Sequence, residues 1–155
     1  MQNIIEKYIH KLQDAGLTEA GQALLGFLDA DLVWNRQDSN TEMLAKIFDG
    51  ININSLLFAP PREPYKSIID YLSETEENTI SPEDCETRTF IHDIPVVSHL
   101  DPDLLLDALK TRKAVIVKNK GILTYGWVSP EQTYINYSSV CFACFVKFFS
   151  DYLRD

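Results

Sequence analysis

The residues best suited to chemistry lie in the stretch Lys113–Gly126, KAVIVKNKGILTYG. Two short apolar runs flank the polar residues Lys118, Asn119 and Lys120, so the pattern predicts two strands joined by a tight turn, whose backbone Gly121 would permit. A lysine on such a turn can bind a carboxylate or a phosphate, and a desolvated lysine can lose its proton and form a Schiff base. Lys118 would share a strand face with Lys120. The alternative is that Lys120 is a solvated turn residue in an ion pair.

Two more basic side chains follow the apolar segment Ile53–Phe58 and the prolines behind it. Arg62 and Lys66 could line the same hollow as Lys120 and hold a small anionic ligand. The alternative for both is a plain surface position.

The cysteines and histidines suggest two other kinds of site. Cys141 and Cys144 have the spacing of a redox pair, but they lie in an aromatic run in the middle of a predicted helix. Reactive pairs favour a helix N-terminus, which lowers the thiol pKa, so we expect two small apolar core residues instead. The three histidines and Cys85 match no known zinc-ligand spacing and predict no zinc site.

The apolar periodicity predicts one α/β domain over residues 1–155, a sheet of roughly five strands covered by helices. Helices are expected at Ile4–Gly16, Thr18–Leu28, Glu42–Phe48, Pro64–Leu72, Asp101–Ala108 and Pro130–Leu153. Strands are expected at Leu32–Trp34, Ile53–Phe58 and Ile94–Val97, the last at a sheet edge with Phe90 and Ile91, and in the two runs of Lys113–Gly126. The acidic segment Ser73–Glu83 has no apolar period and predicts a loop. Ser129 and Gln132 predict a capping box for the terminal helix.

The strand–turn–strand stretch resembles the signature of class II aldolases and adducin head domains, in which an Asn-His-Gly follows an apolar strand. Three other segments resemble the same family in the same order: Ile53–Pro60, Ile91–Val97 and the helix start at Ser129–Gln132. The resemblance covers mainly residues 42–150. It implies a class II aldolase-like sheet covered by helices.

The resemblance also implies which residues stand where the family holds its catalytic metal. Phe58 and Pro60 occupy the positions of a His-x-His pair, and Lys120 occupies that of the histidine in Asn-His-Gly. None of the three can donate a lone pair to a cation at neutral pH, whereas a catalytic zinc normally needs three protein ligands. Asn35 matches an asparagine of the family's upstream strand, but only Gln37–Thr41 then separates it from the next helix. That leaves no room for the phosphate loop and the catalytic acid, so we expect a shortened family member with no metal, no cofactor and no aldolase activity.

Composition limits the partners. The 155 residues carry 23 acidic and 14 basic side chains, a formal net charge of −9. Nucleic acids and anionic membranes reward clustered lysine and arginine, so neither is expected to bind. No apolar run is long enough to span a membrane, the first residues lack the pattern of a secretory signal, and the three cysteines suggest a reducing compartment. We therefore expect a cytoplasmic protein.

The terminal helix predicts a partner of another kind. Seven aromatic side chains between Tyr134 and Tyr152 cover nearly all of its circumference, and a helix that is apolar all round is buried on more than one side. A single domain of this size offers limited cover, so we expect a homo-oligomer assembled through this helix. The cyclic tetramers that the resemblance implies agree with this.

The leading hypothesis is therefore a class II aldolase-like protein without the catalytic metal site, a non-lyase binding or assembly module. Two alternatives stay open. One is an enzyme with altered chemistry, acting through Lys120 on a small anionic sugar phosphate or carboxylate. The other is a metal-dependent sugar-phosphate aldolase whose ligands lie at other positions.

Overall fold

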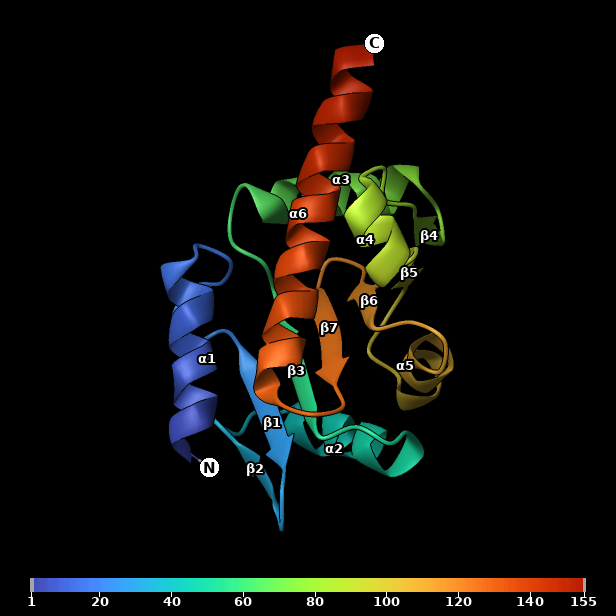
Figure 1. Cartoon of the computed structure of the whole chain (residues 1–155). Helices are drawn as coiled ribbons and strands as arrows, with labels where there is room; N and C mark the ends of the chain where they lie inside the picture. Colours follow the sequence, from blue (N-terminus) through green and yellow to red (C-terminus); the bar gives the residue numbers. More distant parts are fainter. Residues whose placement is uncertain (1, 155) are drawn as a thin grey trace.

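The chain folds around one mixed sheet, shown in Figure 1 by a computed structural model that describes residues 2–154. Its strands are β1 (Leu24–Leu28), β2 (Leu32–Trp34), β3 (Ser55–Ala59), β4 (Thr79–Ile80), β5 (Ile94–Val97), β6 (Ala114–Val117) and β7 (Gly121–Gly126). They lie in the order β2-β1-β3-β7-β6-β5-β4. Only β5 and β6 run parallel, because a helix separates them in the sequence.

Helices cover both faces of this sheet. They are α1 (Gln2–Asp14), α2 (Thr41–Gly50), α3 (Tyr65–Thr75), α4 (Cys85–Phe90), α5 (Pro102–Leu109) and α6 (Pro130–Arg154). Buried side chains of α1, α3 and α6 form one core with one face of the sheet. Those of α2 and α5 form a second core on the other face. None of the helices within residues 2–154 is long and apolar enough to cross a membrane.

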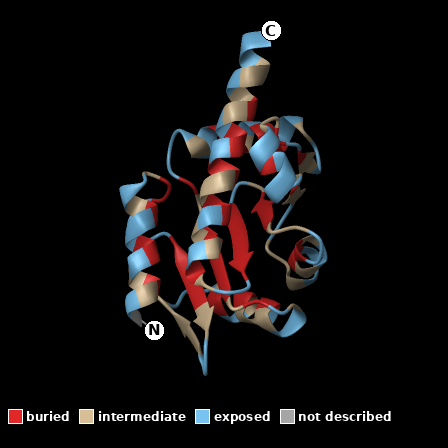
Figure 2. Cartoon of the chain, in the orientation of Figure 1, coloured by how far each residue is buried: buried red, intermediate tan, exposed pale blue. Residues whose placement is uncertain are grey.

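The central strands are buried on both faces, as the red strands of Figure 2 show. In β3, Leu57 and Ala59 belong to the core under α6, while Leu56 and Phe58 belong to the core under α2 and α5. A strand buried on both sides favours apolar residues on both faces, and this explains the continuous apolar run Leu56–Ala59. The expected class II aldolase-like sheet covered by helices is confirmed, with seven strands instead of about five.

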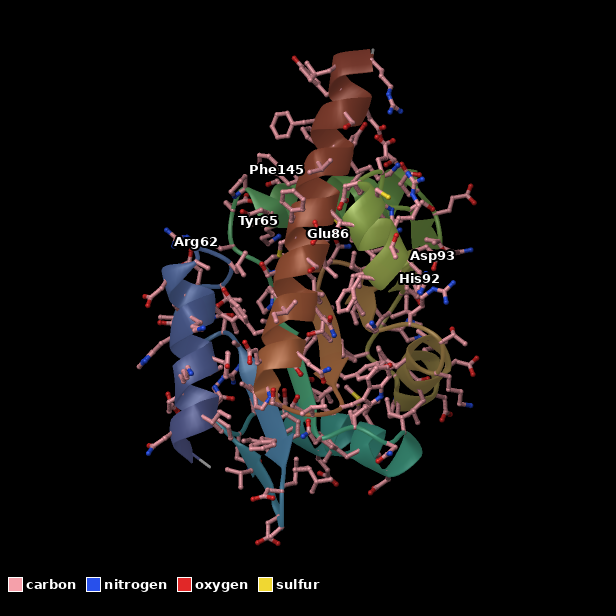
Figure 3. The ribbon with its side chains drawn as sticks, in the orientation of Figure 1. Arg62, Tyr65, Glu86, His92, Asp93 and Phe145 are labelled. Carbon is pink, nitrogen blue, oxygen red and sulfur yellow. The ribbon has the colours of Figure 1, made fainter. Side chains whose placement is uncertain are left out.

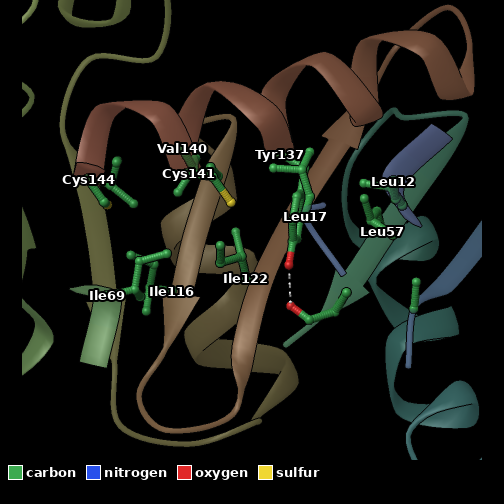
Figure 4. Close-up of a cluster of buried hydrophobic side chains, with 14 of the residues drawn as sticks. Leu12, Leu17, Leu57, Ile69, Ile116, Ile122, Tyr137, Val140, Cys141 and Cys144 are labelled. Carbon is green, nitrogen blue, oxygen red and sulfur yellow. Dashed lines mark hydrogen bonds between the residues drawn. The ribbon is translucent and has the colours of Figure 1, made fainter. Parts of the chain in front are cut away.

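The long helix α6 lies across the sheet and is fixed to it by polar contacts as well as by packing. Tyr137 is fully buried, and its hydroxyl donates a hydrogen bond of 2.9 Å to the carbonyl of Ala59 at the end of β3 (Figure 4). The Oγ1 of Thr124 in β7 donates to the carbonyl of Thr133 at 3.0 Å. The last turns of α6 project beyond the rest of the domain (Figure 1).

The helix expected at Thr18–Leu28 is wrong. Residues 18–23 form turns, with Gly21 at a φ of 78°, and Leu24–Leu28 is strand β1 between β2 and β3. Leu24 and Leu25 are buried on opposite faces of the sheet. The resulting apolar cluster has the same spacing as one face of a helix, and this misled the prediction.

The acidic segment also contains structure that the sequence did not predict. Residues up to Thr75 continue α3, and Thr79–Ile80 forms β4, which pairs with β5. The expectation that Ile94–Val97 lies at an edge is therefore wrong, and Phe90 ends helix α4 instead of extending the strand. The signal for α4 was Asp84, whose side chain caps the helix by accepting from the Thr87 amide at 2.9 Å.

The start of α6 is capped differently from the expected capping box. The Oε1 of Gln132 accepts hydrogen bonds from the amides of Trp127 and Val128, at 2.8 and 2.9 Å, rather than from Ser129. Gln132 thus fixes the loop that leaves β7, in addition to its place in the first turn of α6.

We predict that Tyr137→Phe lowers the free energy of unfolding by about 1–2 kcal/mol, because the Ala59 carbonyl loses a buried donor. Tyr134→Phe is the matched control, since Tyr134 is half-buried on the same helix and its hydroxyl makes no hydrogen bond within residues 2–154. Urea unfolding monitored by circular dichroism measures both. Equal losses of stability in the two variants would contradict the structural role of the Tyr137 hydroxyl.

Candidate functional site

The predicted hairpin is confirmed, and its turn is made by Asn119. Asn119 has a φ of 61°, in the left-handed region that asparagine tolerates, and the amide of Lys120 donates to the carbonyl of Val117 at 2.9 Å. Gly121 is needed for a different reason than expected. A Cβ at this position would lie 2.7 Å from the carbonyl oxygen of Ala59, so glycine lets β7 approach the end of β3.

The three positions that the sequence resemblance aligns with metal ligands lie in two environments. Phe58 pairs with Leu123 and is 7% exposed, packed in the core under α2 and α5. Pro60 and Lys120 lie beyond the strand ends and line a common hollow with Asn119. Lys120 is exposed. The structure therefore brings Pro60 and Lys120 together, while the ring of Phe58 is part of the core.

The hollow beside Lys120 is small. Its volume is about 40 Å³, and Lys66 and Asp70 of α3 also line it. A single water needs about 10–15 Å³, so the hollow has room for a few waters or one small anion. Lys66 is already paired with Asp70, at 2.9 Å, which leaves Lys120 as the available cation of this hollow.

Asn35 has a structural position. Its Oδ1 accepts from the amide of Leu25 at 2.7 Å, and its Nδ2 donates to the carbonyl of Ala23 at 3.0 Å. The side chain thereby extends the pairing of β1 and β2 by one step. Each end of the amide thus bonds the chain's own backbone, which gives Asn35 a structural role in the sheet.

Arg62 and Lys118 also have partners within the chain. Arg62 pairs with Glu19 at 3.2 Å, beside the end of α1, and Lys118 pairs with Glu74 at 3.5 Å. Neither lines the hollow beside Lys120. Figure 3 places Arg62 on the opposite side of the molecule from His92, one of the three histidines.

A cluster of charges that the sequence did not predict involves the acidic segment. Lys147 is only 8% exposed, and its Nζ lies 3.5 Å from Glu76, 3.8 Å from Glu83 and 3.6 Å from Asp151. Arg154 also reaches Glu83, at 3.2 Å. The acidic segment therefore holds α6 through these ion pairs. The only sequence signal was a lone lysine within an aromatic helix.

The two helical cysteines are buried, as expected. Burial raises the pKa of the Cys144 thiol to about 12 and that of Cys141 well above its usual value. Both belong to the core under α6 (Figure 4), whereas Cys85 is exposed. Thiols in this state are poor nucleophiles, and they act as small apolar side chains.

The fold matches known structures. L-fuculose-1-phosphate aldolase from Thermus thermophilus superposes with a TM-score of 0.84 and 12% sequence identity, over 99% of this chain and 95% of that chain. An aldolase II superfamily protein from Pseudomonas syringae superposes with a TM-score of 0.63 and 12% identity, over 94% and 72% of the two chains. The chain has the class II aldolase fold.

Other comparisons agree at the level of the fold. L-fuculose 1-phosphate aldolase from Glaciozyma antarctica PI12 has a TM-score of 0.69 and 13% identity, over 98% of this chain and 73% of that chain. No protein-family model matches the sequence, and no curated protein sequence matches it. The class II aldolase fold is therefore visible in the backbone arrangement, although neither sequence comparison finds a match.

The residues at the three metal positions do not fit a divalent cation. The rings of Phe58 and Pro60 offer no donor atom, and the ammonium of Lys120 repels a cation. Across residues 2–154, no three side chains of histidine, cysteine, aspartate or glutamate converge in a way that could hold a metal ion. The donor set of the described residues therefore disagrees with the catalytic metal that the resemblance implies.

We predict that one of the three thiols in the native protein reacts with a disulfide thiol reagent, and that all three react after unfolding. Cys85 is exposed, while burial keeps Cys141 and Cys144 protonated and out of reach. The Cys85→Ser variant should lose the native reaction. Rapid reaction of two or more thiols in the folded wild type would contradict the buried placement.

The donor set also predicts the metal content. The purified protein should contain no stoichiometric zinc, cobalt or manganese, because Phe58, Pro60 and Lys120 stand at the ligand positions. Elemental analysis after dialysis against a metal-containing buffer measures this. About one metal ion per chain would show that other residues form a site, and would favour the aldolase alternative.

Proposed function

We propose that this class II aldolase-fold chain lacks the lyase's metal site and works as a homo-oligomeric binding or assembly module. The observation that supports this most directly is an exposed aromatic cluster on α3 and α6. Its members are Tyr65, Tyr71, Phe145, Phe148, Phe149 and Tyr152. Phe149 is 42% exposed and Tyr152 is 68% exposed.

The aromatic cluster is continuous. The ring centres of Phe145 and Phe149 lie 4.8 Å apart, and those of Phe148 and Phe149 lie 5.3 Å apart. The ring of Tyr71 meets that of Phe148 edge to face, with 5.6 Å between the ring centres. Figure 3 shows Tyr65 on α3 beside Phe145 on α6, at the side of the helix that faces away from α4. Aromatic residues that gather on one surface of a soluble protein are typical of interfaces.

A second copy of the chain is the partner that fits this surface. The copies each carry a net charge of −9, so a stable contact between them needs an uncharged centre. The centre of the aromatic cluster is uncharged. In a two-fold interface the cluster of one copy would pack against the same cluster of the other copy. The charged residues Asp151 and Arg154 lie at its border, where rim residues of interfaces are polar.

The two enzymatic alternatives have less support. The aldolases named above share the fold at 12–13% identity, and a sugar-phosphate lyase of that kind would need metal ligands that the described residues do not bring together. An anion-specific enzyme around Lys120 would have a hollow of about 40 Å³. Lys118 and Arg62, expected to help bind the anion, are paired with carboxylates of the chain itself.

We predict that Phe149→Glu gives a folded but smaller species. A charged residue in the centre of an aromatic interface costs association on the order of 2 kcal/mol or more, about 30-fold in the dissociation constant. Leu104→Glu is the matched control, because it places the same charge at an exposed apolar position on α5, on the other face of the sheet. Light scattering at micromolar concentration measures the mass.

The wild type and Leu104→Glu should then share one oligomeric mass, and Phe149→Glu should have a lower one. A wild type that runs as a monomer of 17.7 kDa would contradict assembly through α6. Circular dichroism of the three proteins separates a loss of assembly from a loss of folding.

A further inference from the structure

A second cavity lies at the far end of the β6–β7 hairpin from Lys120. Its volume is about 160 Å³, four times that of the hollow beside Lys120. It is formed where the end of α4, the residue before β6, the end of β7 and the first turns of α6 meet. Its lining residues are Phe90, Lys113, Tyr125, Gly126, Trp127, Gln132 and Asn136. One water needs about 10–15 Å³, so a molecule the size of one ring fits.

The amine in this cavity is Lys113, and aromatic rings surround it. Its Nζ lies 3.7 Å from the centre of the Phe90 ring and 5.8 Å from that of Trp127. Burial lowers the pKa of Lys113 from its usual value, and no neighbouring carboxylate opposes this. The faces of the Phe90 and Trp127 rings attract the protonated amine and keep it beside them. Partial burial acts in the opposite sense and lowers the pKa, which increases the neutral fraction whose lone pair can attack a carbonyl.

The wall around Lys113 is held in a fixed shape. Gln132 holds the amides of Trp127 and Val128, and the rings of Tyr125 and Trp127 meet edge to face at 5.7 Å. The Nδ2 of Asn136 donates to the carbonyl of Tyr125 at 2.8 Å. Binding a ligand here would therefore need little ordering of the protein, which favours affinity.

One buried polar atom of a lining residue has no hydrogen-bond partner among residues 2–154. Asn136 is 3% exposed, and its Oδ1 accepts no hydrogen bond from residues 2–154. A buried acceptor without a donor is unfavourable, and such atoms are rare in folded proteins. Asn136 is itself a lining residue of the cavity, so the cavity has a polar residue among its aromatic walls.

We propose that this cavity is a binding site for a small aromatic aldehyde or ketone, which forms an imine with Lys113. Flat aromatic walls suit a planar ring, and the amine lies among them. The lone pair of the neutral amine attacks the carbonyl carbon, and the electrons of the carbonyl π bond move to oxygen, which is protonated. The carbinolamine then loses water, so the carbonyl oxygen leaves with the two hydrogens of the amine and a C=N bond remains. No oxidant or reductant takes part.

This site is independent of the proposed assembly through the aromatic cluster on α3 and α6. It also differs from the Schiff base first considered for Lys120. Lys120 is exposed and lies beside a hollow of about 40 Å³, whereas Lys113 is half-buried in a cavity with aromatic walls.

The test uses para-hydroxybenzaldehyde as the probe and cyanoborohydride to reduce any imine to a stable amine, near neutral pH. The full-length protein is labelled and then digested, and mass spectrometry of the peptides locates the label. Lys110, which is exposed on the same segment, is the internal control. We expect Lys113 to be labelled roughly fivefold or more faster than Lys110, because more of it is neutral and the ring is held beside it.

Two variants test the aromatic wall. Trp127→Ala should lower labelling of Lys113 by about threefold or more, whereas Val128→Ala, at the exposed neighbouring position outside the cavity lining, should leave it unchanged. Lys113→Arg should remove the label at this position and leave that at Lys110, while circular dichroism shows an unchanged fold. Labelling that is even across exposed lysines, or that is insensitive to Trp127→Ala, would overturn the proposal.

Discussion

The hydrogen bonds between α6 and the sheet determine how this molecule is arranged. Tyr137 is bonded to Ala59 in β3, Thr133 to Thr124 in β7 and Asn136 to Tyr125 in β7. These groups are buried, where an unpaired polar atom is costly and a hydrogen bond is directional. Apolar packing alone would let a helix slide or rotate over a flat sheet. The polar contacts fix which side of α6 faces β3 and β7, and therefore which side faces solvent.

The orientation of α6 has consequences at both of its ends. At its C-terminal end the helix leaves the sheet, and Lys147 holds it through ion pairs with Glu76 and Glu83 of the acidic segment. The aromatic side chains beyond the sheet then remain uncovered, which is the basis of the proposed assembly. At its N-terminal end the same rotation places Gln132 and Asn136 in the wall of the cavity around Lys113.

The fold and the chemistry of the site have separate physical requirements. The fold of this chain depends on apolar residues on both faces of the central strands, a left-handed turn at Asn119 and a close approach at Gly121. A metal site needs donor atoms at a few positions that contribute little to folding. Phe58 shows how the requirements separate, because a phenylalanine packs well at a position where a ligand would need a lone pair.

The sequence by itself determined the hairpin Lys113–Gly126, the helices α5 and α6 and the burial of the helical cysteines. Each of these depends on local spacing or on a capping residue, which neighbouring positions reveal. Only the tertiary structure decided that Leu24–Leu28 is a strand, because its burial on two faces comes from neighbours that are distant in sequence. The same holds for the charged candidates. Arg62 and Lys118 could each have met a ligand, and the chain's own carboxylates, brought close by folding, are their partners instead.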